Sequence, residues 1–294
     1  MLLEEWPDPL VTDLARRRVV IVIGSGVSKH ALGADGATRP PVWKEFLKTA
    51  ADKIGRSAET DHIFRSIEEG DLLHACEWIK HRLDEDWTKH LRACFVDPRF
   101  TAGDLHRKIA MLDSRVVFSL NFDDIYETES RRVNETSQFV KNYYDTDVCE
   151  FLRGEARYVV KVHGNLASPA KLIFTQEEYS RARIEHSLFY SAFDSALMTH
   201  TFLFLGCGHN DPDVNLLLEN QAFRSIPGSV SPHYFVTSSG ITEDLKRSLR
   251  KNRNLKTLVY EKVDDSHSGL TDAVDKLLER VTFAREALSE NNNW

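Results

Sequence analysis

The chain has 294 residues, of which 41% are apolar, and its formal net charge at pH 7 is −7. This composition excludes a disordered chain, because it supplies enough apolar surface for a sizeable core. It also argues against a nucleic-acid-binding surface. The basic stretches at residues 16–18 and 246–253 are short and mixed with apolar side chains, as on solvated helix faces.

Cysteine usage and the N-terminus indicate a cellular compartment. The four cysteines, at positions 76, 94, 149 and 207, form no C-x-x-C pair, which argues against a disulfide framework and a structural zinc site. The opening residues MLLEEWPDPL are acidic and contain two prolines, unlike a secretory signal. No apolar run approaches the ~18 residues of a membrane span. We therefore expect a cytoplasmic protein without zinc, membrane contact or a nucleic-acid ligand.

Short apolar runs rich in β-branched and aromatic residues recur along the chain and predict buried strands. They lie at residues 19–23, 116–120, 158–162, 201–205 and 233–237, with a weaker run at 257–261. Continuous apolar runs are typical of strands that helices cover on both faces. The sequence therefore predicts an α/β fold with a doubly wound, mostly parallel, Rossmann-like sheet.

Amphipathic segments between these runs predict helices. The long interval at about 44–112 carries apolar residues at three- and four-residue spacing, with a break at Gly70, and predicts a helical insertion. A second helical stretch is expected at about 177–200, and a closing helix at 270–288. Without an internal repeat, residues 1–294 are interpreted as a single domain.

A polar or glycine-rich turn follows each of four predicted strands. Ligands of open α/β sheets bind outside the carboxyl ends of the strands, where the strand order reverses. We therefore expect these turns to converge on one crevice. The turns are Gly24-Ser25-Gly26, Asn121-Phe122-Asp123-Asp124, His163-Gly164-Asn165 and Gly206-Cys207-Gly208-His209.

Each turn taken alone has an ordinary explanation. Gly24 and Gly26 would bring backbone N–H groups against a diphosphate, or they form a tight turn without a ligand. Position 29 is lysine where the dinucleotide fingerprint has its third glycine, which argues against a hydride-transferring enzyme. Asn121 alone would serve as a helix cap. The rarer feature is His163 at the end of a different strand, aimed with Asn121 into one crevice.

In chain order, the motifs resemble those of the sirtuin family over about residues 15–285. Gly24-Ser25-Gly26-Val27-Ser28 resembles the sirtuin G-A-G-x-S loop, with serine in place of alanine. Leu120-Asn121-Phe122-Asp123 resembles the Q-N-I-D segment, with leucine in place of glutamine. Val162-His163-Gly164 resembles the H-G segment, and Leu205-Gly206-Cys207-Gly208 occupies the place of the later G-T-S loop. The ordered set is more specific than any one motif.

The resemblance implies NAD as the ligand and assigns roles to the motifs. Asn121 would position the nicotinamide ribose or the attacking water, and His163 would be the general base. The glycine loops would hold the diphosphate and the adenosine half. The residues expected to bind NAD are Gly24, Ser25, Gly26, Ser28, Asp123, Gly206, Cys207, Gly208 and His267.

Three of these expected contacts have a second interpretation. Asp123 would bind ribose hydroxyls or cap the following helix. Cys207 has no neighbouring base in the sequence, and we interpret it as a small loop residue rather than a nucleophile. His267, like His209, would reach the adenine end of the cleft or lie on the surface.

Departures from the family narrow the function. Deacetylating sirtuins carry a zinc ribbon of two C-x-x-C pairs after the catalytic histidine, whereas residues 165–202 contain no cysteine. The chain resembles instead the bacterial sirtuin-like domains with helical insertions that destroy NAD in antiphage defence by abortive infection. This implies an NAD glycohydrolase that releases nicotinamide and ADP-ribose. Nicotinamide leaves from a cationic ring, so one positioned water and one histidine base suffice, unlike the two carboxylates of sugar hydrolases.

An unrestrained NAD hydrolase would be toxic to its own cell, so its activity is expected to depend on oligomerisation or on a partner. A HerA-like ATPase or a short Argonaute would be such a partner. Two alternatives remain open. One is a protein deacylase lacking zinc, whose NAD consumption would require an acylated peptide. The other is a non-catalytic sensor of NAD or ADP-ribose.

Overall fold

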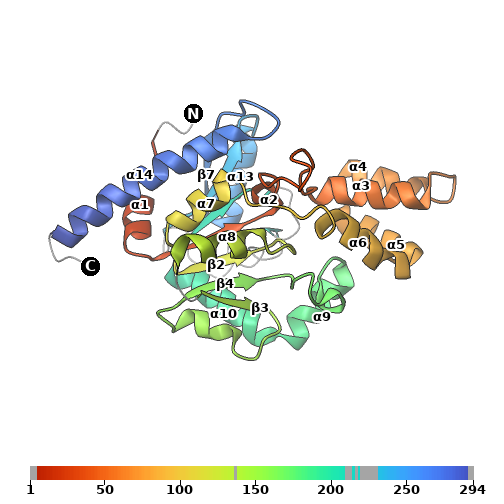
Figure 1. The fold of residues 1–294 in the computed structure, drawn as a ribbon, viewed down its shortest axis with the longest axis horizontal. Coiled ribbons are helices and arrows are strands. Elements are labelled where there is room, and N and C mark those ends of the chain that lie inside the picture. The colour runs from red at the N-terminus through yellow and green to blue at the C-terminus, as the bar shows by residue number, and fades with distance from the viewer. Residues whose placement is uncertain (1–4, 136–137, 209–213, 216–217, 219–230, 291–294) are drawn as a thin grey trace.

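The computed structural model describes residues 5–135, 138–208, 214, 215, 218 and 231–290, so His209 lies outside the described residues. Within them, one seven-stranded parallel sheet has the order β3-β4-β2-β1-β5-β6-β7 (Figure 1). The predicted doubly wound α/β fold is thereby confirmed. The strands are β1 (Val19–Ile23), β2 (Val116–Ser119), β3 (Gln138–Asn142), β4 (Arg157–Lys161), β5 (Thr201–Leu205), β6 (His233–Ser238) and β7 (Leu255–Tyr260).

The pattern of apolar runs does not predict β3. This strand forms one edge of the sheet, where it pairs with β4, and its Phe139 side chain is 47% exposed. An edge strand that is half open to solvent lacks the continuous apolar run of a central parallel strand. Two predicted strands also end one residue early, at Ser119 and Lys161, so the turns begin at Leu120 and Val162.

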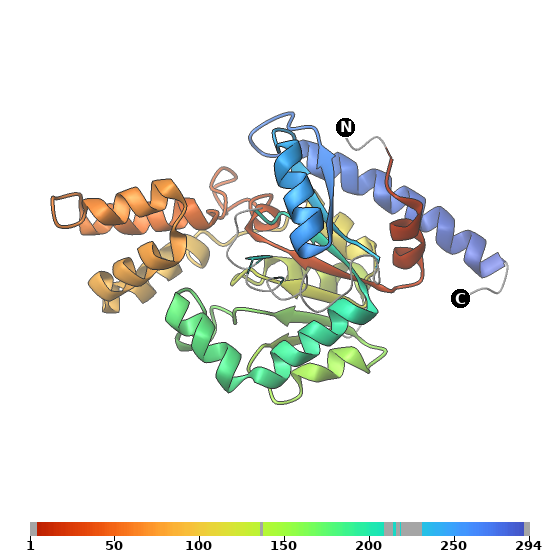
Figure 2. The ribbon, with the colours of Figure 1, turned by 180° about the vertical axis from the view of Figure 1, so that it is seen from behind.

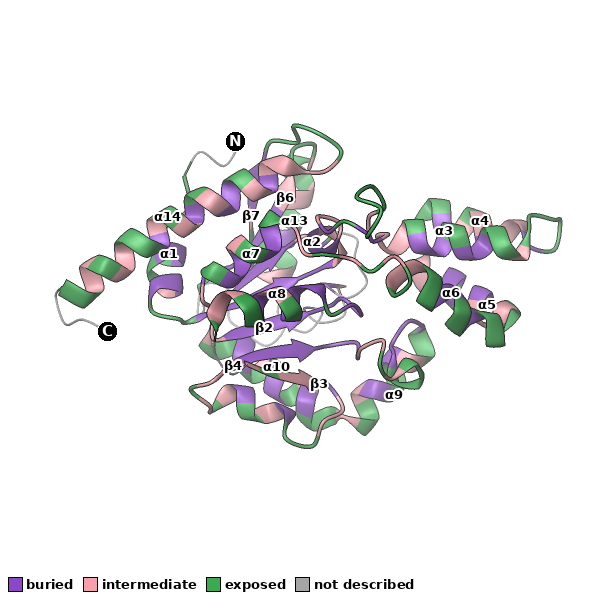
Figure 3. Ribbon diagram, viewed as in Figure 1, coloured by how far each residue is buried: buried purple, intermediate pink, exposed green. Residues whose placement is uncertain are grey.

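Helices cover both faces of the sheet, and the central strands between them are therefore buried (purple in Figure 3). Because side chains alternate along a strand, Val20 and Val22 join the core on one face, while Ile21 joins the core on the other. The first face is covered by η1 (Val148–Leu152), α10 (Ser187–Thr199) and α13 (Glu243–Arg253). The second is covered by α1 (Asp8–Ala15), α2 (Ser25–Ser28), α7 (Asp104–Met111), α8 (Ile125–Asn134) and α14 (Ser268–Glu290).

The helical insertion protrudes from one side of the sheet (Figures 1 and 2). It has its own apolar core, which meets the main body at Phe122, Leu172 and Phe174. The last helix of the interval predicted as an insertion, α7, packs instead on α8 and α14. It therefore belongs to the layer that covers the sheet. The helices of the insertion are α3 (Trp43–Ile54), α4 (Asp61–Glu69), α5 (Leu72–Leu83) and α6 (Glu85–Phe95).

The second helical stretch consists of α9 (Gln176–Glu185) and α10, preceded by the short η2 (Pro169–Lys171). The closing helix α14 packs along α1, and the indole N–H of Trp6 donates to the carbonyl of Ala273 at 2.8 Å. The two ends of the described chain are thus tied together. None of the described helices is both long and apolar enough to span a bilayer.

Candidate active site

The first and fourth turns meet where the strand order reverses, because β1 pairs with β2 on one side and with β5 on the other. The Gly24 N–H donates to the Leu205 carbonyl at 3.0 Å, and the Gly26 N–H donates to the Gly206 carbonyl at 2.9 Å. A Cβ on Gly26 would lie 2.7 Å from that carbonyl oxygen. The glycines therefore serve the close approach of two turns. The N–H groups of Gly24 and Gly26 are thus used between the two turns, and the role of this loop in binding a diphosphate stays a prediction.

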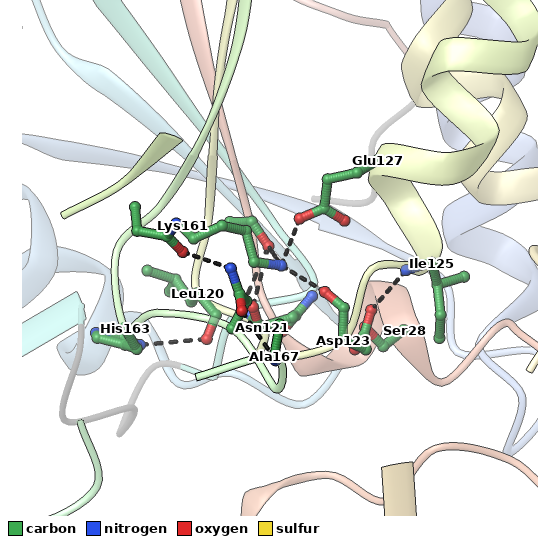
Figure 4. Close-up of polar contacts among 12 residues, drawn as sticks. Ser28, Leu120, Asn121, Asp123, Ile125, Glu127, Lys161, His163 and Ala167 are labelled. Carbon is green, nitrogen blue, oxygen red and sulfur yellow. Dashed lines mark hydrogen bonds and ion pairs between the residues drawn. The ribbon is translucent and has the colours of Figure 1, made fainter. Parts of the chain in front are cut away.

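Asn121 is held against the glycine turn rather than at a helix end. Its side-chain amide donates to the Gly24 carbonyl at 3.0 Å, and its backbone N–H donates to the Ser119 hydroxyl at 3.3 Å (Figure 4). The side chain is 7% exposed. Asn121 thus joins the end of β2 to the end of β1 across the expected crevice.

Asp123 lies just before α8 (Ile125–Asn134), whose N-cap residue is Asp124. The Oδ1 of Asp123 accepts from the N–H of Ile125, the first residue of α8, at 3.2 Å. Its Oδ2 accepts from the Ser28 hydroxyl at 2.7 Å (Figure 4). The structure therefore brings together Ser28 and Asp123, which the sequence predicted separately, and Asp123 also accepts the first N–H of α8.

His163 lies beside the Asn121 loop but is 2% exposed. Its Nδ1 is 3.2 Å from the Leu120 carbonyl oxygen, and its Nε2 is 3.4 Å from the hydroxyl of Tyr179 on α9. Apolar periodicity places Tyr179 on the buried stripe of its helix and gives no sign of this contact. The imidazole of His163 therefore contacts Tyr179, a residue that the sequence did not mark as part of the site.

Among the cavities over the carboxyl ends of the strands, an inner and an outer one are both lined by Ser25 and Trp43. The inner cavity has a volume of about 50 Å³, and the outer cavity about 460 Å³. Predicted site residues of the inner cavity are Ser25, Ser28, Asn121 and Asp123. Those of the outer cavity are Ser25, Gly26, Gly206, Cys207, Gly208 and His267.

The insertion forms part of both walls, which sequence reasoning did not foresee. Trp43, Phe46 and Phe95 line the inner cavity. The Trp43 ring stacks on Phe174 with 5.5 Å between centroids. Its indole N–H is buried and has no hydrogen-bond partner among the described residues. Since the amphipathic pattern marks these side chains only as helix core, their place at the cavity follows from tertiary packing.

The buried ion pair between Lys161 and Glu127 lies next to the Asn121–Asp123 loop and stabilises it. Lys161, 1% exposed, pairs with Glu127 of α8, donates to the Asp123 carbonyl, and lies 3.4 Å from the Ser119 hydroxyl (Figure 4). Burial raises the pKa of the Glu127 carboxyl, and the Lys161 ammonium opposes that shift. The pair therefore ties β4 and α8 to the loop that carries Asn121.

Cys207 and His267, the two remaining candidate residues, have different contacts at the outer cavity. Cys207 is 7% exposed, and its thiol donates to the Leu205 carbonyl at 3.6 Å. His267 lies 2.7 Å through its Nδ1 from the Tyr260 hydroxyl. Burial lowers the pKa of His267, and the nearby Lys262 adds to that shift. Both residues line the outer cavity.

Over the part of the chain that the structure describes, no group of three His, Cys, Asp or Glu side chains forms a metal site.

The fold and the converging turns define an α/β protein whose polar and glycine-rich turns meet at the switch point of a parallel sheet, the place where ligands of this fold class bind. Residues 115–258 match the family model of the SIR2-like domain. This match confirms the resemblance to the sirtuin family that the motifs indicate.

Curated relatives carry related names. The chain is 23% identical over 214 residues to the NAD(+) hydrolase ThsA of Acinetobacter baumannii, an alignment covering 72% of this chain and 40% of that protein. It is 21% identical over 273 residues to the NAD(+) hydrolase ThsA of Bacillus cereus, covering 86% and 54%. Defense-associated sirtuin 2 of Bacillus subtilis is 24% identical over 117 residues, covering 39% and 11%. The chain spans roughly half or less of the length of these relatives.

Proposed function

We propose that the chain is an NAD glycohydrolase that cleaves NAD to nicotinamide and ADP-ribose. The observation that carries this proposal is the divided cleft. Asn121 and Asp123 line the inner cavity, and the glycine turns and His267 line the outer one, with Ser25 shared between them. A dinucleotide also has two halves joined by a diphosphate, so it suits a cleft built in two joined parts. The names of the relatives support the same substrate.

The reaction requires the protein to position one water and to accept one proton. The glycosidic electron pair leaves with nicotinamide, which becomes neutral, and the ribose C1′ becomes oxocarbenium-like. A water then attacks C1′ and loses one proton. Asn121 would position the ribose or this water, and His163 would accept the proton, a role that is worth about 10²- to 10⁴-fold in rate.

The lining of the inner cavity favours hydrolysis over the two alternatives. A deacylase that has replaced the zinc module with helices would need a peptide groove, but side chains of the insertion line the inner cavity. A sensor of NAD or ADP-ribose would need the binding residues but not a buried histidine beside the Asn121 loop.

We further propose that the activity serves antiphage defence by abortive infection in the cytoplasm. Because uncontrolled NAD hydrolysis harms the producing cell, a second signal would release it. Self-association would provide such a signal, as would a partner protein such as a HerA-like ATPase or a short Argonaute. The name of the Bacillus subtilis relative supports the defence role.

The test is the release of nicotinamide and ADP-ribose from NAD without any acylated peptide, at several protein concentrations. Wild type, Asn121→Ala and His163→Ala are compared. Hydrolysis that is lost in both variants is the expected result, and a rate per molecule that rises with concentration would indicate self-association. Turnover that appears only with an acylated peptide would favour the deacylase, and binding of NAD without turnover would favour the sensor.

A further inference from the structure

Tyr179 occupies the place between His163 and the inner cavity. Of these two residues, Tyr179 lines the inner cavity and His163 does not. The tyrosine ring meets the imidazole edge-on, with centroids 5.4 Å apart and an interplanar angle of 74°. A molecule in the inner cavity therefore meets the phenol before it meets the imidazole.

The position of Tyr179 is well anchored. It lies in the first turns of α9, which Thr175 caps by accepting from the Glu178 N–H at 3.3 Å. Glu178 in return accepts from the N–H groups of Thr175 and Phe174, at 3.1 and 2.8 Å. This reciprocal capping box fixes the start of the helix. The phenol is thus held at the cavity by local structure and not only by its contact with His163.

The hydrogen bonds of His163 settle its tautomer. The Leu120 carbonyl oxygen can only accept, so the hydrogen in that contact is on Nδ1 of the imidazole. In the neutral ring Nε2 is then the acceptor, and the Tyr179 hydroxyl donates to it. The lone pairs of the tyrosine oxygen remain to accept a proton from the cavity side.

We infer that Tyr179 is a catalytic residue that relays a proton from the attacking water to His163. This inference rests on the proposed NAD hydrolysis. As the water oxygen bonds to C1′, one water proton moves to the tyrosine oxygen, and the tyrosine proton moves to Nε2 of His163. The tyrosine ends neutral, the imidazole becomes a cation, and the departing nicotinamide keeps the glycosidic electron pair. Atoms and charge balance without a further reactant.

The relay explains how a histidine that is 2% exposed can serve as the base. Direct contact of a water with Nε2 would require the water to displace the Tyr179 hydroxyl. A relay through Tyr179 keeps that hydroxyl in place and also keeps the bond of His163 to Leu120. Leu120 adjoins Asn121, so the base and the positioning amide remain attached to one loop.

The test replaces Tyr179 with phenylalanine, which removes the hydroxyl and keeps the ring. Tyr190→Phe is the matched control, because the Tyr190 hydroxyl on the neighbouring helix α10 is buried without a hydrogen-bond partner among the described residues. We expect kcat for NAD to fall about 10²-fold in Tyr179→Phe, as for loss of a proton-transfer group. KM, ADP-ribose binding and the thermal midpoint should stay close to those of Tyr190→Phe and wild type.

A second measurement uses azide, an anionic nucleophile that has no proton to lose. We expect azide to accelerate nicotinamide release by Tyr179→Phe with formation of ADP-ribosyl azide, and to leave wild type nearly unchanged. Equal kcat in Tyr179→Phe and wild type would overturn the relay alone. A loss of ADP-ribose binding in parallel with activity, or no azide rescue, would assign Tyr179 a packing role instead. A wild type that binds ADP-ribose without hydrolysing NAD would overturn both the proposed function and the relay.

Discussion

Replacing Gly206 with alanine should damage the cleft more than its small size suggests. Gly206 has φ +63°, and a Cβ at this position would lie 2.5 Å from the backbone nitrogen of Val27. A left-handed alanine costs roughly 1–2 kcal/mol, and moving packed backbone apart to admit a methyl group costs about 1–3 kcal/mol more. We therefore expect the free energy of unfolding to fall by about 2–5 kcal/mol.

The matched control is Gly36→Ala. Gly36 has φ +70°, but nothing lies within 4 Å of a Cβ built there. This variant carries the conformational cost of about 1–2 kcal/mol without the collision. At about 2 °C per kcal/mol for a chain of this size, thermal unfolding should separate the two variants by several degrees.

Activity provides the second half of the assay. Because the Gly206 turn bonds to Gly26 and both residues line the outer cavity, Gly206→Ala should raise KM for NAD and weaken ADP-ribose binding. Gly36→Ala should leave both constants near those of wild type. Equal destabilisation by the two variants, or an unchanged KM in Gly206→Ala, would refute the idea that the approach of the two turns shapes the cleft.

Other predictions rest on single contacts. Trp43→Phe removes a buried N–H that has no partner among the described residues. We expect this N–H to bind the substrate, so KM for NAD should rise by roughly 2- to 10-fold, as for the loss of one hydrogen bond. An unchanged KM would contradict the contact. Lys161→Met leaves Glu127 buried without its cation, so urea unfolding should show a loss of about 3–5 kcal/mol. Arg157→Met, which breaks a partly exposed pair at the opposite end of β4, should cost less, and a reversed order would count against the buried pair. Burial lowers the pKa of His233 from 6.5 to about 4. The unfolded chain therefore takes up a proton there as pH falls from 6.5 towards 4, and stability should decline by at most about 1.4 kcal/mol per pH unit. The thermal midpoint of His233→Asn should depend less steeply on pH over this window, and identical slopes would contradict the assignment.

The fold could be predicted from the sequence because its signals are local. A strand covered on both faces needs consecutive apolar residues, and such runs are visible without knowledge of any partner. The residue that follows a parallel strand lies at the ligand-binding edge whatever the order of the strands. Asn121 and His163 could therefore be singled out. The edge strand β3 escaped because half-exposed residues such as Phe139 leave no apolar run.

The candidate site depended on contacts between residues that are distant in the chain. Apolar periodicity identifies Tyr179 and Trp43 as buried, but it cannot distinguish a side chain that fills a core from one that lines a cavity. It likewise cannot show that the Gly24 and Gly26 N–H groups are used by the turn after β5. Nor can it pair Lys161 with Glu127 across two elements. Six of the seven strands, and the residues that follow them, could be predicted from the sequence because both depend on local burial. Which groups remain open to a ligand depends instead on tertiary contacts, because distant backbone and side-chain atoms already satisfy some of these groups.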